Sequence, residues 1–129
     1  MLLGEYPKDI RQYSPLALAF VGDGVYELFV REHLMLLANR PAGELHRRAV
    51  KLVRASAQAE AAERMMPLLS EEELAVFKRG RNAHTGHTPK NASDAQYHAA
   101  TGLEALFGYL HLSGRDDRAR ELFTQCISA

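Results

Sequence analysis

Apolar residues recur along this chain at the three- and four-residue spacing of amphipathic helices, and no segment shows the alternation expected of a β-strand. The most apolar stretch is residues 16–34, which read LALAFVGDGVYELFVREHL. Ser14 is a favourable N-cap residue for it, and Pro15 suits a first helical turn. The pattern predicts one long helix ending near Asn39, with an apolar stripe of Leu18, Val21, Val25, Leu28 and Leu34, widened by Phe20, Phe29 and Val30.

Shorter helices are predicted on both sides of this one. A bend is expected near residues 54–56, and Ser70 with Glu73 has the spacing of a capping box. The length of 129 residues suits one domain with a proper core, so the sequence predicts an all-α fold in a single domain over residues 1–129. The further helical segments are expected at residues 8–13, 42–66, 70–83, 94–112 and 115–127.

Composition narrows the class of protein. The chain is 47% hydrophobic and 25% charged, which is ordinary for a globular protein. Its single cysteine, Cys126, cannot form a disulfide within the chain, so a reducing compartment is expected. The first residues lack the basic flank and apolar run of a signal peptide, and no apolar run is long enough to span a bilayer. We therefore expect a cytoplasmic protein.

Basic side chains gather in two regions of a chain that has no net charge, with 16 basic and 16 acidic residues. Such clusters can form a local anion-binding surface, although each could also be a solvated helix face. Neither cluster contains an acid. The first cluster consists of Arg47, Arg48, Lys51 and Arg54, and the second of Lys78, Arg79, Arg81 and Lys90.

The second cluster extends into the one clear loop, residues 84–93, which read HTGHTPKNAS. The histidines at positions 84 and 87 lie near Lys90, but a zinc site needs more ligands, and the only cysteine is distant in sequence. Contacts from polar loop side chains to phosphate groups are the favoured interpretation.

Asp23 is placed unusually, in the middle of the long apolar helix between Gly22 and Gly24. Each glycine costs roughly 1 kcal/mol of helix stability relative to alanine, and aspartate is also a poor residue in a helix interior. Two small neighbours would let a backbone, a metal ion or a phosphate approach the carboxylate. The alternative is a kinked helix whose aspartate faces solvent.

Glu104 is a second acid in an apolar helix, with Ala100, Leu103, Phe107 and Gly108 around it. A partly desolvated carboxylate needs a cation or a hydrogen-bond partner. One explanation is a salt bridge to an arginine. The sharper hypothesis is that Asp23 and Glu104 converge on one site, since two carboxylates with bound waters suit Mg²⁺. Beside basic clusters, such a site indicates phosphodiester chemistry.

The segments around these two acids resemble the ribonuclease III family. Residues 18–27 (LAFVGDGVYE) are similar to the signature helix of that family, and residues 101–110 (TGLEALFGYL) to its second catalytic helix. Residues 44–47 (ELHR), 78–82 (KRGRN) and 88–91 (TPKN) are similar to motifs of Mini-ribonuclease III, its short bacterial branch without a double-stranded-RNA-binding domain. Together these motifs extend the resemblance over most of the chain.

The resemblance implies a helical bundle like the endonuclease domain of the family, working as a homodimer with one acidic site per subunit along a valley for an RNA duplex. It implies that Asp23 and Glu104 are catalytic and bind Mg²⁺, and that Phe20 packs across the dimer interface. The residues expected to contact RNA are Arg47, Lys78, Arg79, Arg81, Asn82, His87, Thr88, Lys90 and Asn91.

The sequence departs from full-length ribonuclease III at three positions. Leu16, Ala19 and Thr101 stand where those enzymes have further acids. Two acids per subunit would leave more of the coordination shell of a metal ion to water and phosphate. Glu27, one turn after Asp23, is expected to pair with Arg31 at i+4 or with another core group, and to affect stability more than metal binding.

The sequence therefore predicts a Mg²⁺-dependent endoribonuclease acting on double-stranded RNA, and the resemblance implies maturation of the precursor of large-subunit (23S) ribosomal RNA. One alternative is a catalytically weak RNA-binding or ribosome-assembly module on the same fold. Such a module would not need Asp23 and Glu104 inside apolar helices. A metal-dependent hydrolase of nucleotides is a third possibility, but it would have no use for two separated basic clusters.

Overall fold

The protein is seen in a computed structural model that describes residues 2–6, 9–83 and 93–127. All the regular secondary structure in these ranges is helical, which confirms the predicted all-α class. None of these helices is long and apolar enough to cross a membrane. In chain order the elements are η1 (Ile10–Gln12), α1 (Pro15–Leu37), α2 (Ala42–Val53), α3 (Ala55–Met65), η2 (Met66–Leu68), α4 (Glu71–Arg81), α5 (Asp94–Leu112) and α6 (Asp116–Ile127).

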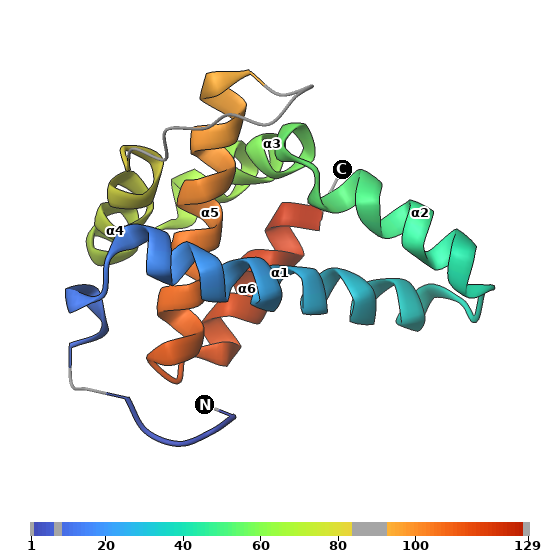
Figure 1. Cartoon of the computed structure of the whole chain (residues 1–129), viewed down its shortest axis with the longest axis horizontal. Coiled ribbons are helices and arrows are strands. Elements are labelled where there is room, and N and C mark those ends of the chain that lie inside the picture. The colour runs from blue at the N-terminus through green and yellow to red at the C-terminus, as the bar shows by residue number, and fades with distance from the viewer. Residues whose placement is uncertain (1, 7–8, 84–92, 128–129) are drawn as a thin grey trace.

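Helix α5 is the centre of the fold, and α1, α3, α4 and α6 pack around it (Figure 1). From Ala100 to Leu112 it is buried on almost every side, and only Glu104 and His111 keep intermediate exposure. Helix α1 crosses it, and the C-terminal half of α1 runs outward beside α2 (Figure 1). A charged residue on α5 therefore lies inside the protein unless it faces an opening between the surrounding helices.

Glycines let the backbones of α1 and α5 touch where these helices cross. A Cβ atom at Gly22 would lie 1.6 Å from the carbonyl oxygen of Glu104, and one at Gly108 would lie 1.9 Å from that of Leu18. No side chain fits at such distances, so both positions require glycine. The crossing places Asp23, the neighbour of Gly22, beside Glu104. Gly24 differs, because a Cβ there would meet nothing within 4 Å in the described residues.

The predicted helix boundaries are confirmed where local signals set them. The Ser14 hydroxyl accepts a hydrogen bond from the backbone N–H of Ala17, and Ser70 forms the expected capping box with Glu73. The expected bend in the second helical region is a break at Arg54, whose backbone is extended between α2 and α3. Ser93 caps α5 in a second capping box, with Gln96.

The predicted stripe of α1 is wrong at Leu28, which was expected on the inner side but has an exposed fraction of 54%. Phe20, which widened the stripe, is 83% exposed and is therefore accessible for the dimer interface that the family resemblance implies. The cause is that α1 is apolar on nearly all sides, so the pattern alone could not identify its inner face. The close contact at Gly22 selects the inner face, which carries Leu18, Ala19, Gly22, Tyr26, Val30 and Leu34.

Candidate active site

Asp23 of α1 and Glu104 of α5 come together at the crossing of the two helices. Their side chains lie within hydrogen-bonding reach of one another, and their charges interact. Helix α1 runs unbroken through Asp23, and Asp23 is exposed, as the alternative expected, but its carboxylate also interacts with Glu104. Asp23 is on the solvent side of the pair and Glu104 on the inner side. The structure thus brings together the two acids that the sequence singled out.

The Glu104 carboxyl is in an environment that disfavours its charge. Burial, and after it the neighbouring Asp23 carboxylate, raise the pKa of Glu104 to about 8 from an ordinary value of 4.5. The salt bridge to an arginine that the sequence left open does not form, because every ion pair among the described residues involves other acids. A cation bound between the two carboxylates would relieve their repulsion, so the pair favours cation binding.

Gln58 of α3 is a third member of this site, and it was not among the residues predicted from the sequence. Its side chain is only 2% exposed and lies close enough to the Glu104 side chain to donate a hydrogen bond to it, which opposes the rise in the pKa of Glu104. A signal was present, because Gln58 stands at helical spacing from the buried residues Ala61, Ala62 and Met65. A polar residue on a buried stripe requires a partner, but the sequence did not reveal which partner.

The donor atoms at this site fit a hard divalent cation. Asp23 and Glu104 offer carboxylate oxygens, which Mg²⁺ prefers, and few protein ligands leave room for the waters that this ion retains. No group of three or more His, Cys, Asp or Glu side chains suited to a metal ion occurs in the described residues. The two acids could therefore hold Mg²⁺ with water and phosphate completing its coordination.

Helix α4 is held close against α5 by a second pair of glycines. A Cβ at Gly80 would lie 2.6 Å from the Cβ of Ala105, and one at Gly102 would lie 2.8 Å from the carbonyl oxygen of Phe77. This contact explains the glycine between the basic residues of α4. It also fixes the last turn of α4, with its cluster of cations, against the helix that carries Glu104.

The four predicted RNA-contacting residues at the end of α4 have different surroundings. Lys78 and Arg79 are exposed, and the Arg79 guanidinium donates a hydrogen bond of 3.4 Å to the carbonyl oxygen of Tyr13, bracing the start of α1. The guanidinium of Arg81 contacts the side-chain oxygen of Asn82 at 3.5 Å. The other predicted contacts in this region, His87, Thr88, Lys90 and Asn91, lie outside the described residues.

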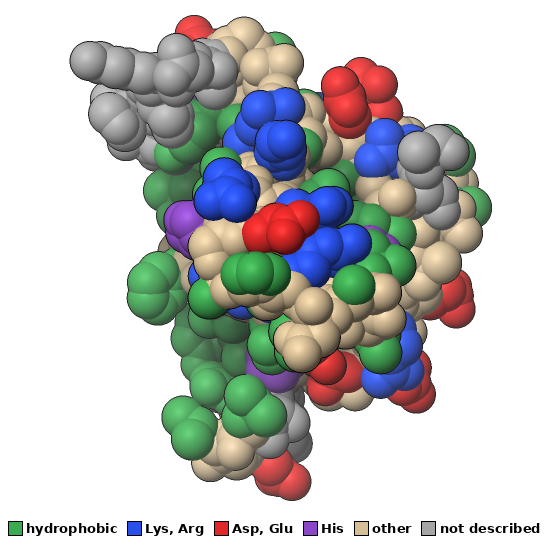
Figure 2. Space-filling model, turned by 90° about the vertical axis from the view of Figure 1, so that its right-hand side faces the viewer, with side chains coloured by type: hydrophobic (Ala, Val, Ile, Leu, Met, Phe, Trp, Pro, Cys, Tyr) green, Lys and Arg blue, Asp and Glu red, His purple; other side chains and the backbone are tan. Residues whose placement is uncertain are grey.

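The first basic cluster forms a separate surface on α2. Figure 2 shows Lys and Arg side chains gathered around an acidic side chain on this side of the molecule. Glu44 accepts ion pairs from Arg40 and Arg48 at 3.6 and 3.0 Å, which neutralises part of the cluster. Arg47 is exposed and borders a hollow with Lys51. These cations lie on a different helix from both acids.

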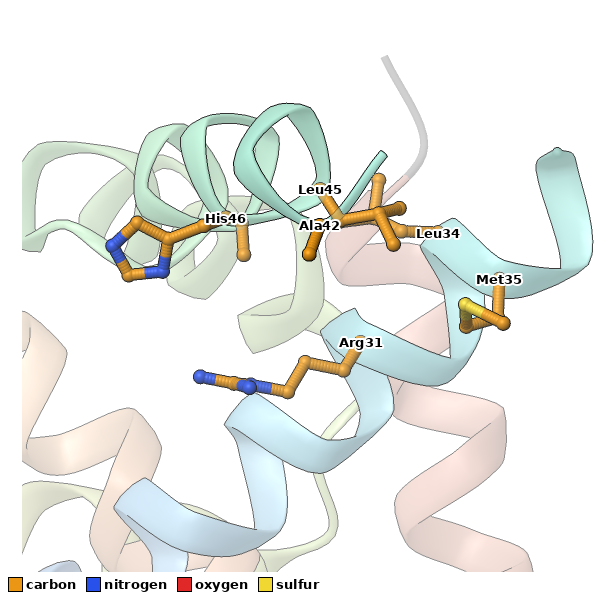
Figure 3. A pocket seen from close by; sticks show the side chains of 7 residues that line it. Arg31, Leu34, Met35, Ala42, Leu45 and His46 are labelled. Atoms are coloured by element: carbon orange, nitrogen blue, oxygen red, sulfur yellow. The ribbon is translucent and has the colours of Figure 1, made fainter. Parts of the chain in front are cut away.

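Two other features near the acids have different roles. Glu27 pairs with Arg31 at 3.2 Å, as expected for an i, i+4 contact on α1. A cavity of about 240 Å³ lies between α1 and α2 (Figure 3), but neither Asp23 nor Glu104 lines it. Its walls are mainly apolar, with two polar side chains, and consist of Arg31, Leu34, Met35, Ala42, Leu45, His46 and Ala49.

Comparisons with known proteins agree with the fold. Residues 16–115 match the model of the ribonuclease III domain. A Mini-ribonuclease 3 from Enterococcus faecalis is 43% identical over 122 residues, covering 93% of this chain and 92% of the relative. Another from Brevibacillus brevis is 44% identical over 124 residues, covering 96% of this chain and 92% of the relative. A crystal structure of a Fusobacterium nucleatum protein, 30% identical, superposes with a TM-score of 0.82 and covers 92% of this chain and 94% of its own.

The fold and the domain match define a nuclease of the ribonuclease III type, an endoribonuclease of double-stranded RNA. The chain belongs to the ribonuclease III family, in its Mini-ribonuclease III branch.

Proposed function

We propose that this endoribonuclease hydrolyses phosphodiester bonds of duplex RNA with a Mg²⁺ ion held by Asp23 and Glu104. The observation that carries the proposal is the meeting of these two carboxylates at the crossing of α1 and α5. A bound Mg²⁺ supplies a nucleophilic water and stabilises charge on the attacked phosphate. Asp23 would hold the ion from the solvent side, and Glu104 from the buried side.

The same observation disfavours a pure binding module on this fold. Two carboxylates in contact repel one another, and the raised pKa of Glu104 reflects that repulsion together with burial. A protein that only bound RNA would gain from losing either acid. Groups with strongly shifted pKa values beside a specific charged partner are typical of catalytic sites.

Incubation with a labelled RNA duplex and with each of its strands alone tests the substrate class. In Mg²⁺ we expect the duplex to be cut and both single strands to remain intact, because recognition would depend on A-form shape and on phosphate and 2′-OH groups. Equal cleavage of the single strands would contradict a duplex substrate.

We further propose the precursor of large-subunit (23S) ribosomal RNA as the natural substrate, and the cytoplasm as the compartment. The family resemblance supports the first, and the single cysteine of the chain supports the second. Incubation of a precursor transcript containing the paired ends of this RNA should release a mature-length product. The same transcript with its terminal stem disrupted should remain uncut.

We assign the RNA path to the end of α4, where Lys78 and Arg81 lie on a turn fixed against α5. Arg79 would also belong to this path, although its guanidinium already donates a hydrogen bond to the carbonyl oxygen of Tyr13. Asn82 would add a neutral hydrogen-bonding group. On sequence grounds the path continues through residues of the adjoining loop, and Arg47 on α2 would extend it. The loop residues in this assignment are His87, Thr88, Lys90 and Asn91.

Removal of a phosphate contact should lower the salt dependence of binding. We expect Lys78→Ala and Arg81→Ala each to weaken binding of all duplex sequences about equally, and to reduce the slope of log K against log salt by roughly one. Binding measured across a salt series with Mg²⁺ omitted checks this. Arg120→Ala on α6, which removes an exposed cation paired with Asp117, should leave the slope unchanged. Parental slopes in both α4 variants would exclude α4 from the RNA path.

We propose that the enzyme is a homodimer formed through the exposed side of α1. Large apolar side chains on this side include Phe20, Leu28 and Met35, and Met35 is 58% exposed. Measured along the axis of α1, the point midway between positions 27 and 28 is about 11 Å from Phe20 in one direction and about 11 Å from Met35 in the other. A two-fold axis there, with antiparallel α1 helices, would bring Phe20 of each copy to Met35 of the other. The cavity of Figure 3, which Met35 and Arg31 line, would then receive the ring.

Truncation of Phe20 should dissociate this dimer. A large aromatic side chain buried at an interface contributes about 2 kcal/mol or more, and a two-fold interface contains it twice. Phe20→Ala should therefore raise the dimer dissociation constant at least a hundredfold, as measured by sedimentation equilibrium. Leu36→Ala is a matched control, because Leu36 is 86% exposed and does not line the cavity that would receive the Phe20 ring. A parent protein that is monomeric at micromolar concentration would refute the proposal.

A further inference from the structure

Gln58 differs from the other polar side chains buried in the described residues. In the part of the chain that the structure describes, and apart from buried tyrosines, the buried polar or charged side chains are those of Gln58, Glu73 and Thr101. Glu73 is paired with Arg118 and caps α4, and the Thr101 hydroxyl donates to the carbonyl oxygen of Tyr97 within α5. The burial of Glu73 is therefore explained by its ion pair, and that of Thr101 by a hydrogen bond within its own helix. The partner of Gln58 is instead the carboxyl of Glu104.

The position of Gln58 is fixed by the fold around it. It lies in the first turn of α3, directly after the break at Arg54, and its backbone N–H donates to the carbonyl oxygen of Arg54. Ala61 and Ala62 are the nearest buried residues on the same helix, and α3 packs along α5. The backbone at Gln58 is therefore held in place beside α5, and the side chain needs only to extend toward Glu104.

An amide suits this position for a chemical reason. An ionised carboxylate only accepts hydrogen bonds, so the amide N–H of Gln58 is the group that can donate to Glu104. A neutral donor orients the carboxylate without adding a charge to the two that are already close together. A glutamate at position 58 would increase the repulsion, and an apolar residue would leave Glu104 unsupported on its inner side.

We propose that Gln58 is a positioning residue, whose side-chain amide holds the Glu104 carboxylate toward Asp23 in the orientation that binds the metal ion. This inference rests on the proposed Mg²⁺ site. Partners that orient metal ligands typically change metal affinity or activity 10- to 100-fold when they are replaced. Gln58 would therefore act on metal binding and on the chemical step, and not on the binding of RNA.

Two variants of Gln58 test the assignment. Gln58→Met keeps the length and burial of the side chain but removes the donor. Gln58→Asn keeps the amide but withdraws it by one methylene from Glu104. Gln125→Met, at an exposed position on α6, is the matched control. Each protein is measured for thermal unfolding in EDTA, for Mg²⁺ affinity by calorimetry without RNA, and for kcat and KM on duplex RNA.

Both Gln58 variants should bind Mg²⁺ at least tenfold more weakly and lose at least tenfold in kcat, with KM for RNA changed less than threefold. Raising Mg²⁺ should restore much of the lost kcat in these variants but not in Asp23→Asn. The assignment is overturned if every Gln58 variant that folds binds Mg²⁺ like the parent, or if Gln58→Asn only lowers the unfolding temperature. Failure of the parent protein to bind Mg²⁺ would instead refute the proposed metal site.

Discussion

Asp23→Asn should reduce cleavage of duplex RNA by roughly a thousandfold or more while the fold and the dimer survive. Asparagine has nearly the same shape but lacks the charge that would hold a metal ion, and the loss of metal-assisted charge stabilisation costs several kcal/mol in the transition state. Asp23 is exposed, so the substitution disturbs no core packing. Single-turnover cleavage measures the effect, and circular dichroism and sedimentation check the fold and the dimer.

Glu27→Gln is the matched control for this experiment. Glu27 is one turn further along α1, and its ion pair with Arg31 is exposed, so the pair contributes only about 0.3–0.5 kcal/mol. We expect cleavage close to the parent rate and a slight loss of stability. If Asp23→Asn cleaves as well as Glu27→Gln, Asp23 is not a metal ligand.

Glu104→Gln should abolish cleavage and yet stabilise the metal-free protein at pH 8. The folded state raises the pKa of Glu104 to about 8 from 4.5, so folding favours the protonated carboxyl. The stability associated with that proton is fully present below about pH 4.5 and is lost as the pH rises through 8. At 1.36 kcal/mol per pH unit, the loss is on the order of a few kcal/mol. The amide of the Glu104→Gln variant is neutral at every pH, so the variant escapes this loss.

Urea unfolding in EDTA at pH 5 and pH 8 measures this effect. The parent and Glu104→Gln should be similar in stability at pH 5, and the variant should be the more stable at pH 8. Added Mg²⁺ should stabilise the parent at pH 8 but not the variant, because only the parent has both ligands. A variant that is less stable than the parent by the same amount at both pH values would contradict the electrostatic account of Glu104.

The features that the sequence predicted correctly depend on local signals or on a family motif. Caps at Ser14 and Ser70 involve residues three apart, and the break at Arg54 lies within the region where a bend was expected. Asp23 and Glu104 were identified because a charged side chain within an apolar helix is unusual in any protein. Their meeting was predicted from the suitability of two carboxylates for Mg²⁺ and was also implied by the family resemblance, but it did not follow from any rule of helix packing.

The features that the sequence did not reveal depend on contacts between distant segments. Gln58 looks like an ordinary residue of an alanine-rich helix until its contact with α5 is known. Gly22 and Gly24 have the same composition around them, but only Gly22 lies at the crossing with α5. Leu28 was expected on the inner side of α1 because the apolar pattern of this helix does not distinguish a buried face from one that a second subunit would cover.

The most direct test of the central claim is the metal dependence of cleavage, together with the chemical nature of the new RNA ends. The claim is that Asp23 and Glu104 hold an ion that activates water, so a labelled duplex should be cut in Mg²⁺ and remain intact in EDTA. Attack by water leaves no 2′,3′-cyclic phosphate on the products. Undiminished cleavage in EDTA, or products ending in a cyclic phosphate from attack by the neighbouring 2′-OH, would contradict the account.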